Sequence, residues 1–255
     1  MADGSLAGQH AVVTGGGKGI GAAITRALAG AGASVTVMGR DAAALNAIAK
    51  EIDCQPITVD LTNEESAGQA FVDAAKLGGS IRILVNNVGA AESAAFGKTS
   101  RALWDRMLSV NMTAAFTCSQ CVLPGMRSHG GGRIINIAST ASLKGYSYVA
   151  AYCAAKHGLL GLTRALAAET AREAITVNAV CPGFAETEML ARSVQTIVNA
   201  TGRSEEEARI ELLRGNPQGR FVQPEEVAAA VLWLCSPEAS GVTGQAIAVD
   251  GGETF

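Results

Sequence analysis

The sequence predicts an α/β fold built on a doubly wound parallel sheet. Short apolar segments alternate along the chain with longer segments in which apolar residues recur at helical spacing, as expected for repeated βαβ units. The short segments are apolar throughout, which is typical of strands that helices cover on both faces. Several of the 30 glycines cluster where these segments end, at positions where the backbone can approach a ligand closely.

The first third of the chain accounts for four of the expected strands, at residues 10–14, 34–38, 56–60 and 81–85. Between them, apolar residues at helical spacing predict helices at residues 20–30, 41–52 and about 62–77. Asp41 can cap the second of these helices, and either Thr62 or Asn63 can cap the third.

The alternation continues through the rest of the chain. Strands are expected at 133–138, 175–180 and 245–249, and helices within 100–127 and at 149–173, 189–214 and 224–235. Pro224 opens the last helix, in the first turn, where proline is tolerated. No proline- or serine-rich boundary and no internal repeat interrupts the pattern, so residues 1–255 are expected to form one domain.

Composition excludes several classes of protein. Of the 255 residues 48% are apolar and 17% charged, which allows a large core and is too apolar for disorder. The net charge of −3 leaves no basic excess, so no nucleic-acid partner is expected. The six cysteines lie in apolar segments, and the C-x-x-C pair Cys118 and Cys121 has no second pair beside it. We therefore expect reduced, mostly buried thiols and no metal site.

The chain carries no sign of export or of membrane insertion. Residues 1–9 are polar and lack the apolar core of a signal peptide. No apolar run reaches the roughly 20 residues that span a membrane. The sequence therefore predicts a cytoplasmic protein without membrane association.

A glycine-rich turn joins the first expected strand to the first expected helix. Its glycines follow the spacing G-x-x-x-G-x-G from Gly15 to Gly21, a variant of the dinucleotide-binding fingerprint. Glycines allow a tight turn and close backbone approach, and the helix N-terminus offers free N–H groups to a pyrophosphate. The expected cofactor-binding residues of the turn are Gly15, Gly17, Lys18, Gly19, Ile20 and Gly21.

The end of the second expected strand indicates which cofactor binds. An acidic residue there would bind the ribose hydroxyls and reject a 2′-phosphate, but this chain has Gly39 followed by Arg40. Arginine suits a phosphate, and Lys18 could add a second positive charge, so NADP(H) is preferred and NAD(H) remains possible. The alternative for Arg40 is a surface residue beside a helix. Asp60, next to Leu61, could accept a hydrogen bond from the adenine amino group.

Tyr152 and Lys156 are four residues apart in an expected helix, and therefore lie on one helical face. A nearby cation favours phenolate and lowers the pKa of a tyrosine toward neutrality, so that the phenol can exchange a proton with a substrate oxygen. For this spacing taken alone, the alternative is a tyrosine and a lysine on the surface. Tyr146 and Tyr148 have no lysine four residues later and are interpreted as residues of a substrate loop.

These motifs occur together in a fixed order. The glycine turn that Thr14 begins is followed by Asn86-Asn87-x-Gly89, Asn111, Ser139, Tyr152-x-x-x-Lys156 and Pro182-Gly183. In this order the sequence resembles the short-chain dehydrogenase/reductase family, from about Gly8 to Gly252, with Val88 where the family usually has alanine. The resemblance implies a Rossmann-type fold and hydride transfer between a nicotinamide cofactor and a carbonyl or alcohol.

The resemblance also implies a role for each catalytic residue. Ser139 would hydrogen-bond the substrate oxygen, with Ser142 as a weaker alternative. Tyr152 would donate the proton in reduction or remove it in oxidation. Lys156 would lower the pKa of Tyr152 and hold the nicotinamide ribose, and Asn111 would anchor a water that relays protons to solvent.

Further positions would hold the cofactor. By the same resemblance, Asn87 and Gly89 would line the adenosine ribose, while Pro182, Gly183 and Thr187 would hold the nicotinamide and its carboxamide. Self-association as a homo-oligomer, a dimer or a tetramer, is also implied, with 111–127 and 150–171 as candidate interfaces.

The later part of the chain bears on the substrate. Residues 182–189 are similar to those of bacterial 3-oxoacyl-carrier-protein reductases, and 189–215 with 219–227 to polyketide ketoreductases and hydroxyacyl-CoA dehydrogenases. Residues of about 188–215 are expected to form a helical lid, although the charged run 203–209 by itself indicates a solvated helix. The substrate pocket is expected between 90–96, 143–149 and 184–214.

The leading hypothesis is therefore an oxidoreductase that uses NADP(H) to reduce a 3-oxoacyl thioester or a related ketone, with Tyr152 as general acid and base. The alternative within enzymes is an NAD-dependent dehydrogenase of a secondary alcohol or hydroxysteroid. A cofactor-binding regulator without catalysis is a different class, and the intact Ser139, Tyr152 and Lys156 argue against it.

Overall fold

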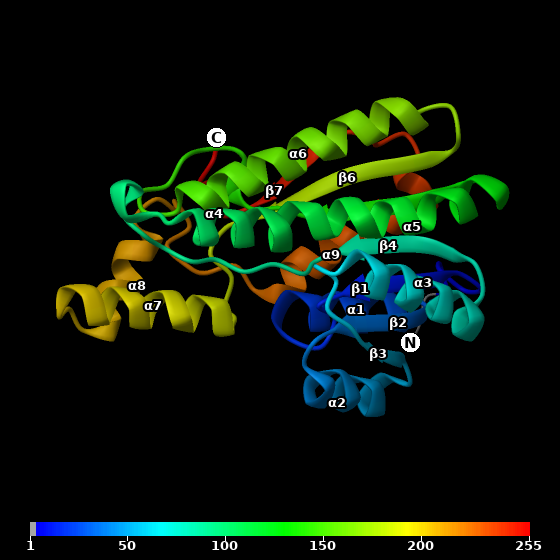
Figure 1. Ribbon diagram of the computed structural model, residues 1–255, viewed down its shortest axis with the longest axis horizontal. Coiled ribbons are helices and arrows are strands. Elements are labelled where there is room, and N and C mark those ends of the chain that lie inside the picture. The colour runs from blue at the N-terminus through cyan, green and yellow to red at the C-terminus, as the bar shows by residue number, and fades with distance from the viewer. Residues whose placement is uncertain (1–3) are drawn as a thin grey trace.

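A parallel sheet forms the centre of the computed structural model, which describes residues 4–255 (Figure 1). Within these residues seven strands pair in parallel in the order β3-β2-β1-β4-β5-β6-β7. The strands are β1 His10–Thr14, β2 Ser34–Gly39, β3 Gln55–Thr58, β4 Ile81–Asn86, β5 Gly132–Ile137, β6 Ile175–Pro182 and β7 Ala246–Val249. The predicted doubly wound fold is confirmed. Residues 1–3, part of the polar start discussed above, lie outside the described residues.

Helices cover both faces of the sheet. They are α1 Gly19–Gly30, α2 Ala42–Ile52, α3 Glu64–Gly78, α4 Arg101–Leu108, α5 Ala114–Ser128, α6 Ala150–Thr170, α7 Glu188–Thr201, α8 Glu205–Leu213 and α9 Pro224–Cys235. Neighbouring strand residues enter opposite cores: Val13 packs with α1 and α9, whereas Val12 packs with α3 and α5. Successive side chains of a strand point to opposite faces, and this is why the strands are apolar without alternation.

The helix starts follow local capping chemistry. The Asp41 carboxylate accepts a hydrogen bond from Ala44 N at 3.1 Å and caps α2. Of the two candidates for α3, Asn63 is the cap, because its side chain accepts from Ser66 N at 2.8 Å. An oxygen at this position satisfies one of the N–H groups that a helix start leaves unpaired.

Several element boundaries differ from the prediction, and the single helix expected at 189–214 is two helices, α7 and α8. β3 ends at Thr58 and not at residue 60, because Asp60 Oδ1 accepts from both Thr62 N and Thr62 Oγ1 and turns the chain. β6 runs on to Pro182, and α6 ends at Thr170. The two helices expected in 100–127 are α4 and α5, joined by a π-helical turn, Ser109–Thr113.

The polar segment of 188–215 contains α7 and α8, which contact each other (Figure 1). Their shared core consists of Leu190 and Val194 from α7, Ala208 from α8 and Phe221. In Figure 1 the pair lies at the left of the view, beside the body formed by the sheet and the other helices. Within residues 4–255, no helix combines the length and the apolar character needed to span a membrane.

Candidate active site

The glycine turn is packed so closely at Gly21 that this position has no room for a side chain, and its backbone at Gly15 favours glycine. Gly15 N donates to Met38 O at 2.6 Å, and Gly15 has a φ of +64°, in the left-handed region that favours glycine. A Cβ on Gly21, in the first turn of α1, would overlap Gly15 O. Lys18, the N-cap of α1, makes no side-chain cap hydrogen bond, so backbone N–H groups of the first turn are available to an anion. Gly17, Gly19 and Ile20 complete this turn.

Asn87 connects this turn to the end of β4. Its Nδ2 donates to Thr14 O at 3.0 Å and to Gly15 O at 3.2 Å, while Asn87 N donates to Thr14 Oγ1 at 2.9 Å. The amide expected beside the adenosine ribose therefore holds the backbone of the turn. Gly89 lies further along this loop, where a Cβ would stand 2.9 Å from Asn111 Oδ1 and 3.6 Å from Lys156 Nζ.

Two basic side chains flank the turn, in different surroundings. Arg40 is exposed directly after β2. The Lys18 ammonium lies 3.0 Å from Asp41 Oδ2 and 3.4 Å from Glu188 Oε1. The second positive charge expected at Lys18 is thus shared with two carboxylates.

Asp60 is exposed and Leu61 is buried, both beyond the end of β3. Hydrogen bonds from Thr62 lower the pKa of Asp60, and the positive charge of Arg40 lowers it further. The ionised carboxylate remains close enough to Arg40 to interact electrostatically, as the neighbouring ends of β2 and β3 require.

Ser139 and Tyr152 are brought together although thirteen positions separate them in the chain. Ser139 follows β5, and its Oγ accepts from Ala141 N at 3.1 Å. The same hydroxyl is hydrogen-bonded to the phenol of Tyr152, on the first turn of α6. Ser142, the alternative, is 2% exposed, and no partner within residues 4–255 meets its buried Oγ. The geometry favours Ser139.

Lys156 is 4% exposed, one turn after Tyr152 on α6. Its Nζ donates to Ile137 O at 2.8 Å, at the end of β5, and stands 5.7 Å from the centroid of the Tyr152 ring. Burial lowers the pKa of Lys156 from its ordinary value to about 8, because desolvation disfavours the charged ammonium.

Lys156 is not among the groups that shift the pKa of Tyr152 in this structure, so its expected lowering of that pKa stays a prediction. Burial raises the pKa of Tyr152, and the hydrogen bond from Ser139 offsets only part of that rise. Lys156 Nζ donates its hydrogen bond to the Ile137 carbonyl rather than to the phenol. A phenol with a raised pKa stays protonated at neutral pH.

Asn111 lies in the π-helical turn between α4 and α5 and is 1% exposed. Its Oδ1 accepts from Ala90 N at 3.1 Å, and its Nδ2 donates to Ala90 O at 2.9 Å and to Met107 O at 3.0 Å. π-Turns recur at functional sites, and this one places an amide where it fixes the loop after β4. The Asn111 side chain therefore holds the backbone of Ala90, which follows Gly89, the glycine close to Lys156 Nζ.

Pro182, Gly183 and Thr187 lie where β6 ends and α7 begins. Gly183 N donates to Val249 O at 3.0 Å, which fastens this loop to β7. A Cβ on Gly19 would stand 3.1 Å from the methyl carbon of Thr187, so the loop expected to hold the pyrophosphate meets the loop expected to hold the nicotinamide. Within residues 4–255, no group of three or more His, Cys, Asp or Glu side chains is placed to hold a metal ion.

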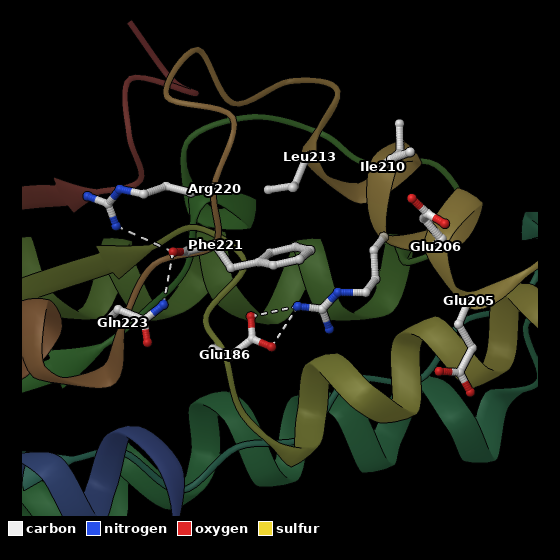
Figure 2. Close-up of a pocket in the computed structure, with 9 residues that line it drawn as sticks. Glu186, Glu205, Glu206, Ile210, Leu213, Arg220, Phe221 and Gln223 are labelled. Atoms are coloured by element: carbon white, nitrogen blue, oxygen red, sulfur yellow. Dashed lines mark hydrogen bonds and ion pairs between the residues drawn. The ribbon is translucent and has the colours of Figure 1, made fainter.

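A separate cavity of about 620 Å³ opens beside α8 (Figure 2). Arg209 crosses it, donating from Nη2 to both oxygens of Glu186 at 2.6 and 2.9 Å and lying 4.6 Å from the centroid of the Phe221 ring. The charged run of 203–209 is thus partly engaged in tertiary contacts. The cavity is lined by Glu186, Glu205, Glu206, Arg209, Ile210, Leu213, Arg220, Phe221 and Gln223, none of them a predicted catalytic residue.

Sequence reasoning missed the part played by the last residues of the chain. Glu253 Oε1 accepts from Tyr146 OH at 2.6 Å and lies 3.1 Å from Lys144 Nζ, so it contacts the expected substrate loop. The local signal was limited to the glycine pair Gly251-Gly252, whose positive φ angles of 65° and 89° turn the chain. No local pattern indicates which distant loop such a turn will meet.

Comparisons with known proteins show which family the chain belongs to. The family described as "Enoyl-(Acyl carrier protein) reductase" matches residues 15–254. A 3-oxoacyl-[acyl-carrier-protein] reductase of Aquifex aeolicus is 38% identical, over 97% of this chain and 98% of that protein. A D-beta-hydroxybutyrate dehydrogenase of Cupriavidus necator is also 38% identical, with the same shares covered.

A solved structure matches the whole architecture. The crystal structure of an actinorhodin polyketide ketoreductase variant with NADPH superposes with a TM-score of 0.94 at 37% identity, covering 100% of this chain and 99% of that one. The chain is thus similar to these proteins along nearly its full length, in addition to the fold, the glycine turn and the Ser139–Tyr152–Lys156 arrangement described above. On these grounds the protein belongs to the short-chain dehydrogenase/reductase family, as its motifs predicted.

Proposed function

We propose that this protein reduces the ketone of a 3-oxoacyl thioester, or a related ketone, to a secondary alcohol with NADPH. The observation that carries the proposal is the arrangement of Ser139 after β5 with Tyr152 and Lys156 on one face of α6, where Lys156 Nζ lies 5.7 Å from the centroid of the Tyr152 ring. A protonated phenol at neutral pH is the state that reduction requires, because the carbonyl oxygen must receive a proton. The names of the reductase of Aquifex aeolicus and of the polyketide ketoreductase support the same chemistry.

The glycine turn fits a bound dinucleotide. A Cβ on Gly21 would overlap Gly15 O, so glycine at this position permits the tight turn that leads into the N-terminus of α1. The first turn of α1 would hold the pyrophosphate, exposed Arg40 the 2′-phosphate, and Asp60 with Leu61 the adenine. Asn87 and Gly89 would line the path of the cofactor. Pro182, Gly183 and Thr187 would hold the nicotinamide. When bound, NADPH supplies the hydride that reaches the carbonyl carbon.

The residues of the chain then supply the proton and the orientation. The Ser139 hydroxyl donates a hydrogen bond to the carbonyl oxygen and stabilises the negative charge that grows there. Tyr152 OH transfers its proton to that oxygen as the C–H bond forms, which leaves a phenolate. The Lys156 ammonium, with a pKa near 8, can return a proton to this phenolate. Asn111 would hold the water that reprotonates Lys156 from solvent.

The domain organisation, the lid, the location and the oligomeric state belong to the same proposal. Residues 1–255 act as one domain, and α7 with α8 forms a lid over the substrate, supported by their separate core around Val194 and Phe221. The protein is a cytoplasmic homo-oligomer, a dimer or a tetramer. Phe116 on α5, which is 44% exposed, supports an interface within 111–127. Sedimentation that finds only monomer at micromolar concentration would contradict the oligomer.

A second candidate function is the oxidation of a hydroxy acid or another secondary alcohol, possible also with NAD. The similarity to a D-beta-hydroxybutyrate dehydrogenase favours it. In that direction Tyr152 would act as the base, and the rate should rise with pH as the phenol ionises.

The experiment is a rate measurement on the purified protein with NADPH or NADH and a 3-oxoacyl thioester, and with NADP or NAD and the matching 3-hydroxyacyl thioester. A cyclic ketone and a hydroxysteroid complete the panel. We expect the highest kcat/KM for NADPH with the 3-oxoacyl thioester at neutral pH. Faster oxidation with NAD would favour the second candidate, and the absence of any turnover would indicate a cofactor-binding regulator.

A further inference from the structure

Glu253 lies buried near the end of the chain, against the substrate loop of residues 143–149. Its side chain is 3% exposed, while that of Lys144 is 37% exposed. Oε1 lies 3.1 Å from Lys144 Nζ and accepts from Tyr146 OH at 2.6 Å. A buried carboxylate is costly unless it is paired and hydrogen-bonded. These two partners therefore tie the substrate loop to the end of the chain.

A chain of hydrogen bonds continues from Glu253 toward the catalytic serine. Tyr146 OH lies 2.7 Å from Thr140 Oγ1, within hydrogen-bond distance. Thr140 directly follows Ser139, whose hydroxyl is bonded to Tyr152. Burial and the neighbouring Glu253 carboxylate raise the pKa of Tyr146, so its phenol keeps the proton that it donates.

The other side of Glu253 meets the loops that enclose the site. A Cβ on Gly183 would stand 3.4 Å from Glu253 Oε2, and a Cβ on Gly215 would stand 3.4 Å from Oε1. Asn216 Nδ2 donates to Asp250 O at 3.1 Å, which binds the segment after α8 to the C-terminal turn. Figure 2 shows this segment beside the dark red end of the chain. One carboxylate thus stands among the substrate loop, the loop after β6 and the exit from α8.

We propose that Glu253 is a positioning residue for the reduction: through Tyr146 and Thr140 it holds Ser139 and the substrate loop in the geometry that the reaction requires. Glu253 touches neither substrate nor cofactor in this role, which rests on the function proposed above. Displacement of a catalytic group by about 1 Å can cost up to about 100-fold in rate. A group that fixes Ser139 from a distance can therefore control turnover.

The test compares Glu253→Ala, Glu253→Gln and Tyr146→Phe with the wild type, with NADPH and a 3-oxoacyl thioester. Glu253→Ala and Tyr146→Phe are each expected to lower kcat/KM for the ketone about tenfold, with the dissociation constant of NADPH changed by less than about twofold. Glu253→Gln keeps an acceptor for Tyr146 OH and should stay within about threefold of the wild type. Tyr146→Phe removes one hydroxyl and keeps the ring against Phe184, so it tests the role even if Glu253→Ala does not fold.

The control is Glu51→Gln, which also breaks an ion pair, the one with Arg26 at 2.6 Å between α2 and α1. It should leave kcat/KM unchanged. In the double variant Glu253→Ala/Tyr146→Phe the loss should be no larger than in either single variant, because both remove the same link. Additive losses, a Gln variant as slow as the Ala variant, or equal losses in ketone turnover and NADPH affinity would each overturn the role.

A second readout does not depend on turnover. Hydrogen exchange of backbone amides in 140–149 should be faster in Glu253→Ala than in the wild type or Glu51→Gln, since the segment loses its contacts with the Glu253 carboxylate. Unchanged exchange there would overturn the contact. If the wild type reduces no ketone with either cofactor, the proposed function fails, and hydrogen exchange still decides whether Glu253 orders this segment.

Discussion

The glycine turn and the substrate loop lie at the same end of the sheet but are held in place in different ways. The turn of residues 15–21 is fixed by backbone hydrogen bonds, such as that from Gly15 N to Met38 O, together with side-chain hydrogen bonds from Asn87 and Thr25. The substrate loop depends on side chains, with Tyr146 and Lys144 reaching Glu253 more than a hundred positions later. Close backbone packing in the turn restricts a position such as Gly21 to glycine. The geometry of the substrate loop depends instead on a residue far along the chain, Glu253.

The largest expected effect is on kcat, from a substitution at Tyr152 that leaves the cofactor-binding turn unchanged. Tyr152→Phe removes the proton donor and keeps the ring, so kcat for ketone reduction should fall by about 10³. NADPH affinity should remain near that of the wild type, as fluorescence titration can show. A variant with kcat comparable to the wild type would remove Tyr152 from the reaction.

A second variant is expected to weaken cofactor binding by changing the glycine turn. Gly21→Ala places a methyl group where Gly15 O stands, so NADPH affinity should fall by at least about tenfold, from loss of the backbone hydrogen bonds that the turn offers. Gly30→Ala is the matched control, since a Cβ at that end of α1 meets nothing within 4 Å. Equal NADPH dissociation constants for the two variants would show that the turn tolerates a side chain.

A smaller effect is expected within the cofactor region. Arg40→Asp should reduce the ratio of kcat/KM for NADPH to that for NADH by about tenfold or more, the worth of a charge-assisted hydrogen bond of ~1.5 kcal/mol. Lys50→Asp, an equal charge change on the exposed surface of α2, serves as the control. If the ratio is the same in both variants, Arg40 does not recognise the 2′-phosphate.

The smallest effect concerns Lys156, which lies between the two regions. Burial lowers its pKa to about 8, so the ammonium is present below that pH and is lost as pH rises through it. The kcat for ketone reduction should therefore be about half its low-pH value near pH 8 and decline above it, because neutral lysine cannot reprotonate Tyr152. A kcat that rises through this range, measured in buffers of constant ionic strength, would assign the proton return to another group.

The sequence by itself determined the sheet and the turn, and it predicted the catalytic residues. Apolar segments without alternation predicted strands covered on both faces. The glycine spacing from Gly15 to Gly21 predicted a tight turn between the first strand and the first helix. The spacing of Tyr152 and Lys156 placed both on one face of α6. These features depend on local propensity and spacing, which a single chain displays directly.

Tertiary structure decided the electrostatics and the distant contacts. Burial raises the pKa of Tyr152 and the Lys156 ammonium donates to Ile137 O, and neither follows from the spacing of the two residues in the chain. That Asp41 and Glu188 share the charge of Lys18, and that Glu253 meets Tyr146, follows from loops that fold together. Spacing along the chain carries no information on such pairs, because burial and Coulomb interactions depend on distance in space.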